Sequence, residues 1–201
     1  MVDLLGLADA LPPGLRVEDS PSLSGKVLDV DRALDEADLP HAIGGALAFA
    51  YYGEPRATLD IDVNVFIPVD RWPRVADALA RLVVDFEVDG REITREKEAR
   101  LLWDRNPIHL FFSHDELHAA MPAAVRRVPF AGSTIPIVSP EHLVARKILL
   151  DRSKDWLDIE AIFVAETPLD LKEIRTWVER LAGRDDPRLA RLAELTTPWR
   201  G

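Results

Sequence analysis

Three polar side chains share one face of a short predicted strand. In R-A-T-L-D-I-D-V-N (residues 56–64), Asp60, Asp62 and Asn64 are each two residues apart. In an extended chain such residues point to the same side, while the isoleucine and valine between them point to the other side and can be buried. Two carboxylates this close repel each other, and a divalent metal ion is the usual compensation. The spacing therefore indicates a metal site on the strand predicted at 60–67.

A pair of glycines precedes this strand. Gly44 and Gly45 end a short apolar stretch and begin a predicted helix. Glycines at such a turn let backbone N–H groups approach a phosphate next to the positive end of the helix. Arg56 and Thr58, in the loop ahead of the strand, are placed to contact phosphate oxygens. A glycine turn or a solvated Asp-x-Asp strand is ordinary by itself, but their order along strand, turn, helix, loop and strand favours a functional site.

Composition limits the remaining possibilities. The chain has 201 residues, enough for one domain with at most a small helical appendage. With no cysteine it has no disulfide framework, thiol nucleophile or Cys-type zinc site. No apolar run approaches the roughly 18 residues of a membrane span, and the start lacks the basic region of a signal peptide, so we expect a cytoplasmic protein without a membrane partner. A net charge of −10 argues against indiscriminate nucleic-acid binding but allows a local basic patch.

Strands and helices alternate before residue 139. Apolar runs bounded by turn residues predict strands, the last two forming a hairpin, at residues 41–45, 60–67, 99–104, 108–112, 124–130 and 134–138. Helical periodicity predicts helices at residues 26–38, 46–53, 70–84 and 115–121. Asp70 is the predicted N-cap of the third of these helices, and residues 85–93 are predicted to form a strand and a turn.

Only helices are predicted beyond residue 138. Ser139 and Pro140 suit the N-cap and first position of a helix, and the helical segments are residues 139–152, 155–165, 170–182 and 186–195. This order predicts an α+β fold. We divide it into an irregular leader (1–25), an α/β core (26–138) and a C-terminal helical region (139–201).

The segment I-G-G-A-L-A-F-A-Y-Y-G-E-P-R-A-T-L-D-I-D-V-N-V-F-I (43–67) resembles the signature of the nucleotidyltransferase superfamily with the DNA polymerase β-like fold. That signature is a hydrophobic residue, Gly-Gly or Gly-Ser, a spacer, and Asp-x-Asp or Asp-x-Glu. The later part resembles the AbiEii-like and MenT-like toxins of toxin–antitoxin systems, which carry a helical lysine and then Arg-x-Lys-Asp-x-x-Asp. Here these are Lys147 and R-S-K-D-W-L-D at 152–158. The resemblance covers roughly residues 40–165. It implies a mixed β-sheet with flanking helices and a C-terminal helical bundle that completes the active site.

The resemblance also implies roles for individual residues. Gly44 and Gly45 would cradle the β- and γ-phosphates of a nucleoside triphosphate such as ATP or CTP. Asp60 and Asp62 would be catalytic and hold two Mg²⁺ ions, which bridge the triphosphate and lower the pKa of an attacking hydroxyl. Lys147 would neutralise the triphosphate.

The second motif adds further charged residues. Asp155 or Asp158 would orient the acceptor or Lys147, and Lys154 would join the nucleotide-binding residues. The charges of this segment recur at helical spacing, which independently predicts one charged helical face. The alternatives are a surface lysine for Lys147, and an N-cap or an ion pair with Lys154 or Arg152 for the two aspartates.

One position departs from the family pattern. Many superfamily members supply a third carboxylate from a neighbouring strand, but the matching I-H-L at 108–110 supplies His109. Imidazole can accept a proton, whereas Mg²⁺ prefers oxygen ligands. Three alternatives follow. His109 is the catalytic base, the site binds nucleotide but turns it over poorly, or a strand other than 108–110 corresponds to the one that carries the third carboxylate. His114 and His118, four residues apart, lack an evident third zinc ligand, so we expect a solvated helix face there.

The expected reaction is Mg²⁺-dependent transfer of a nucleoside monophosphate to a hydroxyl, with release of pyrophosphate. By resemblance, the acceptor is the 3′ end of tRNA and the partner is a cognate antitoxin. Basic residues at 91–105 and at 126–127 would supply the RNA surface, although acidic residues lie among them. The alternatives are a small-molecule acceptor such as an aminoglycoside, a protein hydroxyl, or a member of the fold that binds nucleotide or a partner without turnover.

Overall fold

The computed structural model describes residues 21–82 and 90–197. Its centre is a six-stranded mixed sheet with the strand order β3-β4-β2-β1-β6-β5. β2 and β4 are parallel, as are β1 and β6, and the other neighbouring pairs are antiparallel. The strands are β1 (His41–Ile43), β2 (Ile61–Pro68), β3 (Glu98–Trp103), β4 (Asn106–Ser113), β5 (Arg126–Phe130) and β6 (Ser133–Ile137).

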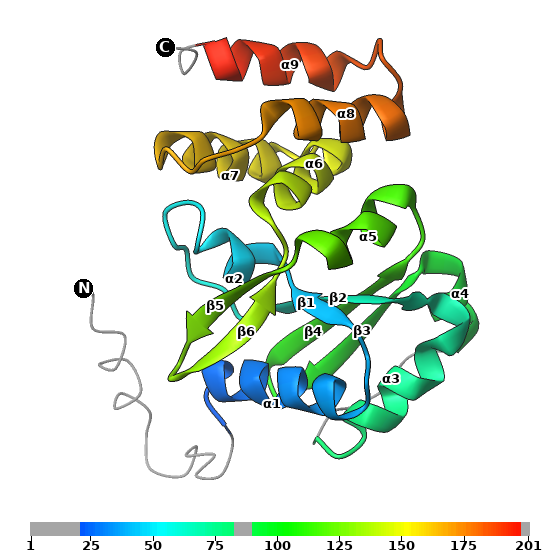
Figure 1. Cartoon of the computed structure of the whole chain (residues 1–201). Helices are drawn as coiled ribbons and strands as arrows, with labels where there is room; N and C mark the ends of the chain where they lie inside the picture. The colour runs from blue at the N-terminus through cyan, green and yellow to red at the C-terminus, as the bar shows by residue number, and fades with distance from the viewer. Residues whose placement is uncertain (1–20, 83–89, 198–201) are drawn as a thin grey trace.

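Helices cover this sheet on both sides (Figure 1). In the view of Figure 1, α1 and α3 lie below the sheet, α4 lies at its right-hand end, and α6 to α9 are stacked above it. Short 3₁₀ turns at Val69–Arg71 and Met121–Ala124 connect neighbouring elements. The helices are α1 (Leu23–Glu36), α2 (Gly45–Phe49), α3 (Trp72–Leu79), α4 (Gly90–Glu96), α5 (Glu116–Ala120), α6 (Pro140–Leu150), α7 (Ser153–Val164), α8 (Leu171–Ala182) and α9 (Pro187–Thr196). The predicted α+β class, with a mixed sheet, flanking helices and a C-terminal helical bundle, is confirmed.

The two faces of β2 differ in the way that the sequence predicts. Ile61, Val63 and Val65 are fully buried and belong to one hydrophobic core with the apolar residues of α1 and α3. Asp62 and Asn64 lie on the opposite face and are partly exposed. Because α1 and α3 occupy the apolar side, the polar side is free to line a pocket.

The start and end of α6 also agree with the sequence. The Ser139 side chain accepts a hydrogen bond from the backbone N–H of His142, and Pro140 is the first helical residue. The helix ends at Asp151, whose backbone is left-handed (φ 53°). The Trp156 indole donates a hydrogen bond to the Asp151 carboxylate, which joins the end of α6 to α7.

Several boundaries differ from the prediction. α1 begins at Leu23, because the Ser22 side chain caps it by accepting a hydrogen bond from the N–H of Gly25. Residues 1–20 lie outside the described part, so the division into leader, core and helical region stays a prediction. Asp70 lies in the 3₁₀ turn before α3 and makes no cap, and α3 begins at Trp72.

The predicted strand and turn at 85–93 is wrong where it can be compared. Residues 85–89 lie outside the described part, and Gly90–Glu96 forms helix α4. This segment is rich in arginine and glutamate, which are good helix formers, and that preference prevails over its short apolar pattern. Within the described residues, no helix is long and apolar enough to cross a membrane.

Candidate functional site

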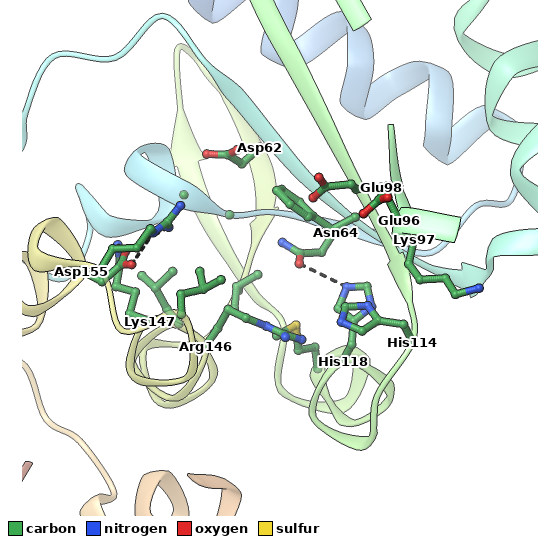
Figure 2. A pocket seen from close by; sticks show the side chains of 18 residues that line it. Asp62, Asn64, Glu96, Lys97, Glu98, His114, His118, Arg146, Lys147 and Asp155 are labelled. Carbon is green, nitrogen blue, oxygen red and sulfur yellow. Dashed lines mark hydrogen bonds and ion pairs between the residues drawn. The ribbon is translucent and has the colours of Figure 1, made fainter. Parts of the chain in front are cut away.

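A pocket with a volume of about 260 Å³ lies between the polar face of β2 and helices α5, α6 and α7 (Figure 2). One wall comes from β2 and the turn before α2, another from α6 and α7, and the rest from α5 and the β3–β4 pair. The polar and glycine residues that line it are Gly44, Gly45, Asp62, Asn64, Glu96, Lys97, Glu98, His114, His118, Arg146, Lys147, Arg152 and Asp155. The pocket therefore gathers residues from both predicted motifs.

The glycine turn lies directly beneath the β2 side chains. Gly45 has a positive φ of 53°, and a Cβ added there would overlap the Asp62 carboxylate. A Cβ at Gly44 would lie 2.6 Å from Asn64 Nδ2. Only glycine allows this approach, which supports the predicted importance of the pair.

One of the two glycine N–H groups that were predicted to bind phosphate already has a hydrogen-bond acceptor within the protein. The N–H of Gly44 donates to the backbone carbonyl of Asp62 at 2.8 Å, so it is engaged within the sheet. Gly45 begins α2, and the first N–H groups of a helix have no intrahelical acceptor. α2 has only five residues, so a phosphate here would be held by close backbone approach more than by the field of a long helix.

Asp62 lies beside His109 on the neighbouring strand. The two residues are paired in register between β2 and β4, and His109 Nδ1 is 3.3 Å from Asp62 Oδ1. His109 Nε2 is buried and has no hydrogen-bond partner among the described residues. His109 is therefore next to Asp62 but is not among the described residues that line the pocket, and its match to the third carboxylate stays a prediction.

Asp60 and Thr58 are more peripheral than the prediction implies. Asp60 is exposed and precedes β2, and its N–H donates to the Thr58 hydroxyl at 3.1 Å. Neither residue is among the described residues that line the pocket. Asp60 lies two residues before Asp62 in the chain and just outside the strand, so its predicted part in the metal site stays a prediction.

Lys147 on α6 lies at the centre of a cluster of five charged side chains. Lys147 is 6% exposed, and its ammonium donates to Asp158 at 2.5 Å and lies 3.6 Å from Asp155. Arg56 donates to both oxygens of Asp158, at 3.2 and 3.3 Å. Arg152 likewise donates to both oxygens of Asp155, at 2.6 and 3.1 Å. Three cations therefore share two carboxylates, which leaves an excess positive charge beside the pocket.

The environment favours the charged forms of Asp158 and Arg152. Burial alone would raise the pKa of Asp158, but hydrogen bonds from Lys147 and Arg56 outweigh it, so the pKa lies below its usual value. The hydrogen bond to Asp155 raises the pKa of Arg152 further above its usual range. Arg56 is thus bound to Asp158, and its predicted phosphate contact stays a prediction. Lys154 is exposed and does not line the described pocket.

The prediction missed a polar network on the α5 side. Arg146 pairs with Asp115 through both guanidinium nitrogens, at 2.9 and 3.2 Å. Asp115 caps α5 by accepting the N–H of His118 at 2.7 Å, and it lies 3.2 Å from His114 Nε2. His118 Nε2 in turn lies 3.2 Å from Asn64 Oδ1 (Figure 2). The only sequence signal was an aspartate three residues before His118, which fits an N-cap.

The predicted solvated face is wrong for His118, which is 1% exposed and whose ring lies 5.5 Å from that of Phe66. His114 is exposed, as predicted, but it precedes helix α5. Burial, with the nearby charges of Arg146 and His114, lowers the pKa of His118 to about 4. It is therefore neutral at pH 7. No group of three or more His, Asp or Glu residues in the described ranges is arranged to hold a metal.

The carboxylates nevertheless suit a metal ion shared with a nucleotide. Mg²⁺ is commonly bound by one or two carboxylates together with substrate phosphates and water, without an all-protein cage. Asp62 lines the pocket, and Asp60 is an exposed carboxylate just before the strand. Their oxygen donors fit this kind of site.

Solved structures of other proteins resemble this chain. A solution structure of the antibiotic-resistance factor ANT(2″)-Ia matches with a TM-score of 0.53 and 21% identity over 84% of this chain and 94% of that chain. A crystal structure of ANT(2″)-Ia with adenylyl-2″-tobramycin matches with a TM-score of 0.56 and 19% identity over 81% of this chain and 98% of that chain. A nucleotidyltransferase-like protein from Paracoccidioides brasiliensis matches with a TM-score of 0.47 and 15% identity over 86% and 92% of the two chains.

The two ANT(2″)-Ia structures show a shared fold, and at these identities they show no more. No curated protein sequence matches the chain. The family model described as "Nucleotidyl transferase AbiEii toxin, Type IV TA system" matches residues 32–198, which is most of the chain and includes both motifs. The chain therefore belongs to the AbiEii nucleotidyltransferase toxin family.

Proposed function

We propose that this nucleotidyltransferase uses the described pocket to move a nucleoside monophosphate from a nucleoside triphosphate to a hydroxyl acceptor, with Mg²⁺. The observation that carries the proposal is that Asp62 and Lys147 line the same pocket, beside the Gly44–Gly45 turn. A carboxylate, a buried ammonium and a turn without side chains are complementary to a metal-bound triphosphate. Family membership supports the class of reaction.

Each wall of the pocket has a separate task. Bound Mg²⁺, held by Asp62 with Asp60, would offset the negative charge of the phosphates. Lys147 and Arg152 stabilise the charge that moves onto the departing pyrophosphate. Asp155 and Asp158 hold these cations in place, because each carboxylate is shared between a lysine and an arginine.

His109 is proposed as a residue that positions Asp62. Its Nδ1 lies 3.3 Å from Asp62 Oδ1, so an Nδ1–H would hold that carboxylate. Its Nε2 is buried, and His109 is not among the described residues that line the pocket, so this nitrogen does not face an acceptor bound there. In the proposed reaction the acceptor oxygen forms a bond to the α-phosphorus, the bond from that phosphorus to pyrophosphate breaks, and the hydroxyl proton passes to water.

We propose the 3′ end of tRNA as the acceptor, a cytoplasmic site of action and a cognate antitoxin as the partner. The family is described as a toxin of a type IV toxin–antitoxin system, and this description implies an antitoxin partner. The hydroxyl at an RNA end is a suitable nucleophile for this reaction. Lys97, at the pocket, and Arg100, on the adjacent exposed strand face, supply basic groups near the point where the RNA would enter.

A small cationic acceptor is the second candidate. Glu96 and Glu98 both line the pocket, opposite the cluster around Lys147, and carboxylates there suit ammonium groups. ANT(2″)-Ia, which shares the fold, was solved with adenylyl-2″-tobramycin. The net charge of −10 also favours a cation over a polyanion.

A single assay distinguishes the two acceptors. Purified protein with Mg²⁺ is incubated with each α-labelled nucleoside triphosphate and either total tRNA or tobramycin. We expect label to enter tRNA, and Asp62→Asn to abolish the transfer while the exposed Lys154→Met retains it. Transfer to tobramycin alone would establish the second candidate. Absence of transfer and of pyrophosphate release, in a protein that still binds nucleotide, would contradict the proposed reaction.

A further inference from the structure

Asn64 is a pocket residue for which the motif gives no role. It follows Asp62 on the same face of β2, lines the pocket and is partly exposed. Its carboxamide lies over the glycine turn, because a Cβ at Gly44 would be only 2.6 Å from Asn64 Nδ2. The amino side of Asn64 therefore faces the place where a phosphate would approach the turn.

His118 fixes which side of the carboxamide faces the turn. Its Nε2 is 3.2 Å from Asn64 Oδ1, and its buried Nδ1 has no partner among the described residues. A buried N–H without an acceptor costs more than an unused lone pair, so the ring proton belongs on Nε2, where it donates to Asn64 Oδ1. The lowered pKa of His118 agrees with this single-proton form. Asn64 Nδ2, with its two N–H donors, is left for the pocket.

The ring of His118 is itself held on several sides. Its backbone N–H donates to Asp115, which Arg146 holds through one hydrogen bond and one ion-pair contact. Phe66 and His114 contact the ring, with ring centres 5.5 and 5.7 Å away. A ring packed this firmly can hold a carboxamide in one orientation, as a binding site needs before its ligand arrives.

We propose that Asn64 donates a hydrogen bond to a phosphate oxygen of the bound nucleoside triphosphate, and that His118 is a positioning residue that keeps the Asn64 amino group turned toward the pocket. The proposal rests on the proposed function, since it takes the glycine turn as the phosphate site. Asn64 would be an uncharged hydrogen-bond donor to the phosphates, in addition to the charged donors Lys147 and Arg152. Its contribution therefore depends on orientation as well as on proximity.

Asn64→Asp gives the first test, because it keeps the shape and replaces the donor by an anion. A hydrogen bond to a charged group contributes enough that we expect the KM for the triphosphate to rise roughly 10- to 100-fold, with a smaller change in kcat. Asn64→Ala should raise KM less than Asn64→Asp. Binding of the matching nucleoside, which lacks phosphates, should be unchanged in both variants. If the Asn64 variants lost affinity for the nucleoside and for the triphosphate equally, the proposed contact with phosphate would be overturned.

The positioning role of His118 needs a comparison between two replacements. His118→Gln keeps an N–H donor on the side chain, so the KM should stay close to that of the wild type. His118→Met fills similar space without a donor, and we expect a rise of about tenfold. Combined with Asn64→Ala, His118→Met should raise KM no further, because the carboxamide that it orients is gone.

Controls separate positioning from general damage and from failure of the proposed function. His142 is also a buried histidine (2% exposed) but lies outside the described pocket lining; its Gln and Met variants should share one KM, and thermal unfolding should confirm that each variant is folded. Equal KM values for His118→Gln and His118→Met would overturn the positioning role. Wild-type protein that binds no triphosphate with Mg²⁺ would overturn the proposed function and this inference together. Binding that is unaffected in both Asn64 variants would overturn the inference alone.

Discussion

Two lysines are buried in the described part of the chain. One of them stabilises the fold and the other lines the pocket, and they differ in how many hydrogen-bond partners the protein gives them. Lys26 on α1 is 2% exposed and donates to the Trp103 carbonyl, Asp104 and Asn106 at 3.0, 2.6 and 3.0 Å. An ammonium has three N–H groups, so these acceptors use all of them. Lys26 therefore ties α1 to the turn between β3 and β4 and has no capacity left for a ligand.

Lys147 is almost as buried but is not used up in this way. Its one hydrogen bond among the described residues goes to Asp158, and Asp155 lies farther away at 3.6 Å. Both carboxylates are shared with arginines, and Lys147 lines the pocket. Burial of a lysine thus says little by itself. What distinguishes a structural lysine from a functional one is whether its donors are all satisfied within the protein.

Replacing Lys147 should produce the largest effect on activity. In Lys147→Met we expect kcat/KM for nucleotide transfer to fall about 10²- to 10³-fold, as for the loss of one preorganised charge at a reaction centre. Stability should change little, because Arg56 still pairs with Asp158 and Arg152 with Asp155. Steady-state kinetics measures the fall in kcat/KM, and thermal unfolding measures the change in stability. A variant that unfolds but keeps its activity would make Lys147 a second scaffold lysine.

The glycine turn offers a matched pair of substitutions. In Gly45→Ala the new Cβ meets the Asp62 carboxylate at a residue with φ 53°, whereas Gly132 has φ 81° and nothing within 4 Å of an added Cβ. Backbone strain should lower the free energy of unfolding of both variants by about 1–2 kcal/mol. Gly45→Ala should lose more than Gly132→Ala, because its Cβ also clashes with Asp62. Only Gly45→Ala should also lower the rate of transfer, by at least about tenfold. Similar rates for the two variants would show that the turn does not contact the substrate.

Replacing Lys26 should have the opposite pattern to replacing Lys147. Lys26→Met leaves the Asn106 carboxamide oxygen buried without its donor, so we expect the free energy of unfolding to fall by about 1–3 kcal/mol. The folded fraction should keep its kcat/KM. Urea denaturation followed by an assay at low temperature measures both quantities. A loss of activity at unchanged stability would contradict the scaffold role.

The smallest effect is expected in the dependence of stability on pH. The lowered pKa of His118, about 4, means that between pH 6.5 and 4 the unfolded chain takes up a proton that the folded chain does not. The free energy of unfolding therefore falls as the pH is lowered through this window. His114 has a raised pKa, mainly through its hydrogen bond with Asp115, and acts in the opposite direction.

His118→Gln isolates the His118 contribution. The variant keeps His114, Asp115 and Arg146, so the difference in pH slope from the wild type belongs to His118. Urea unfolding at pH 7 and pH 5 should show a shallower decline for the variant. Equal slopes would place the unfolded and folded pKa values of His118 close together, and the ring would then not be buried as a neutral group.

Local sequence patterns predicted those parts of the site whose residues lie close together in the chain. The Gly44–Gly45 turn and the polar face of β2 lie within 21 residues, and strand periodicity decides which side chains share a face. Ser139 and Pro140 likewise identified the start of α6. These features depend on neighbours in the chain, so they could be deduced without the fold.

Contacts between distant segments were not predictable in this way. His118 meets Asn64 across 54 positions, and Lys26 meets Asn106 across 80. Nothing in the short helix around His118 shows that Phe66 covers it, so it was predicted to be solvated. Lys154 was placed with the nucleotide-binding residues because of its motif, but it points to the exposed side of α7. Helical spacing gives the period of a charged face and does not say which face the tertiary structure covers.

The central claim is that Lys147 belongs to a triphosphate site. The most direct measurement is calorimetric titration of a nucleoside triphosphate with Mg²⁺ into wild-type protein, Lys147→Met and Lys154→Met. Our account predicts that Lys147→Met raises the dissociation constant at least about tenfold, since it removes a charge-assisted contact with phosphate. It also predicts that Lys154→Met, on the exposed face of the next helix, binds as the wild type does. Equal dissociation constants for all three proteins would contradict the account and place the nucleotide elsewhere.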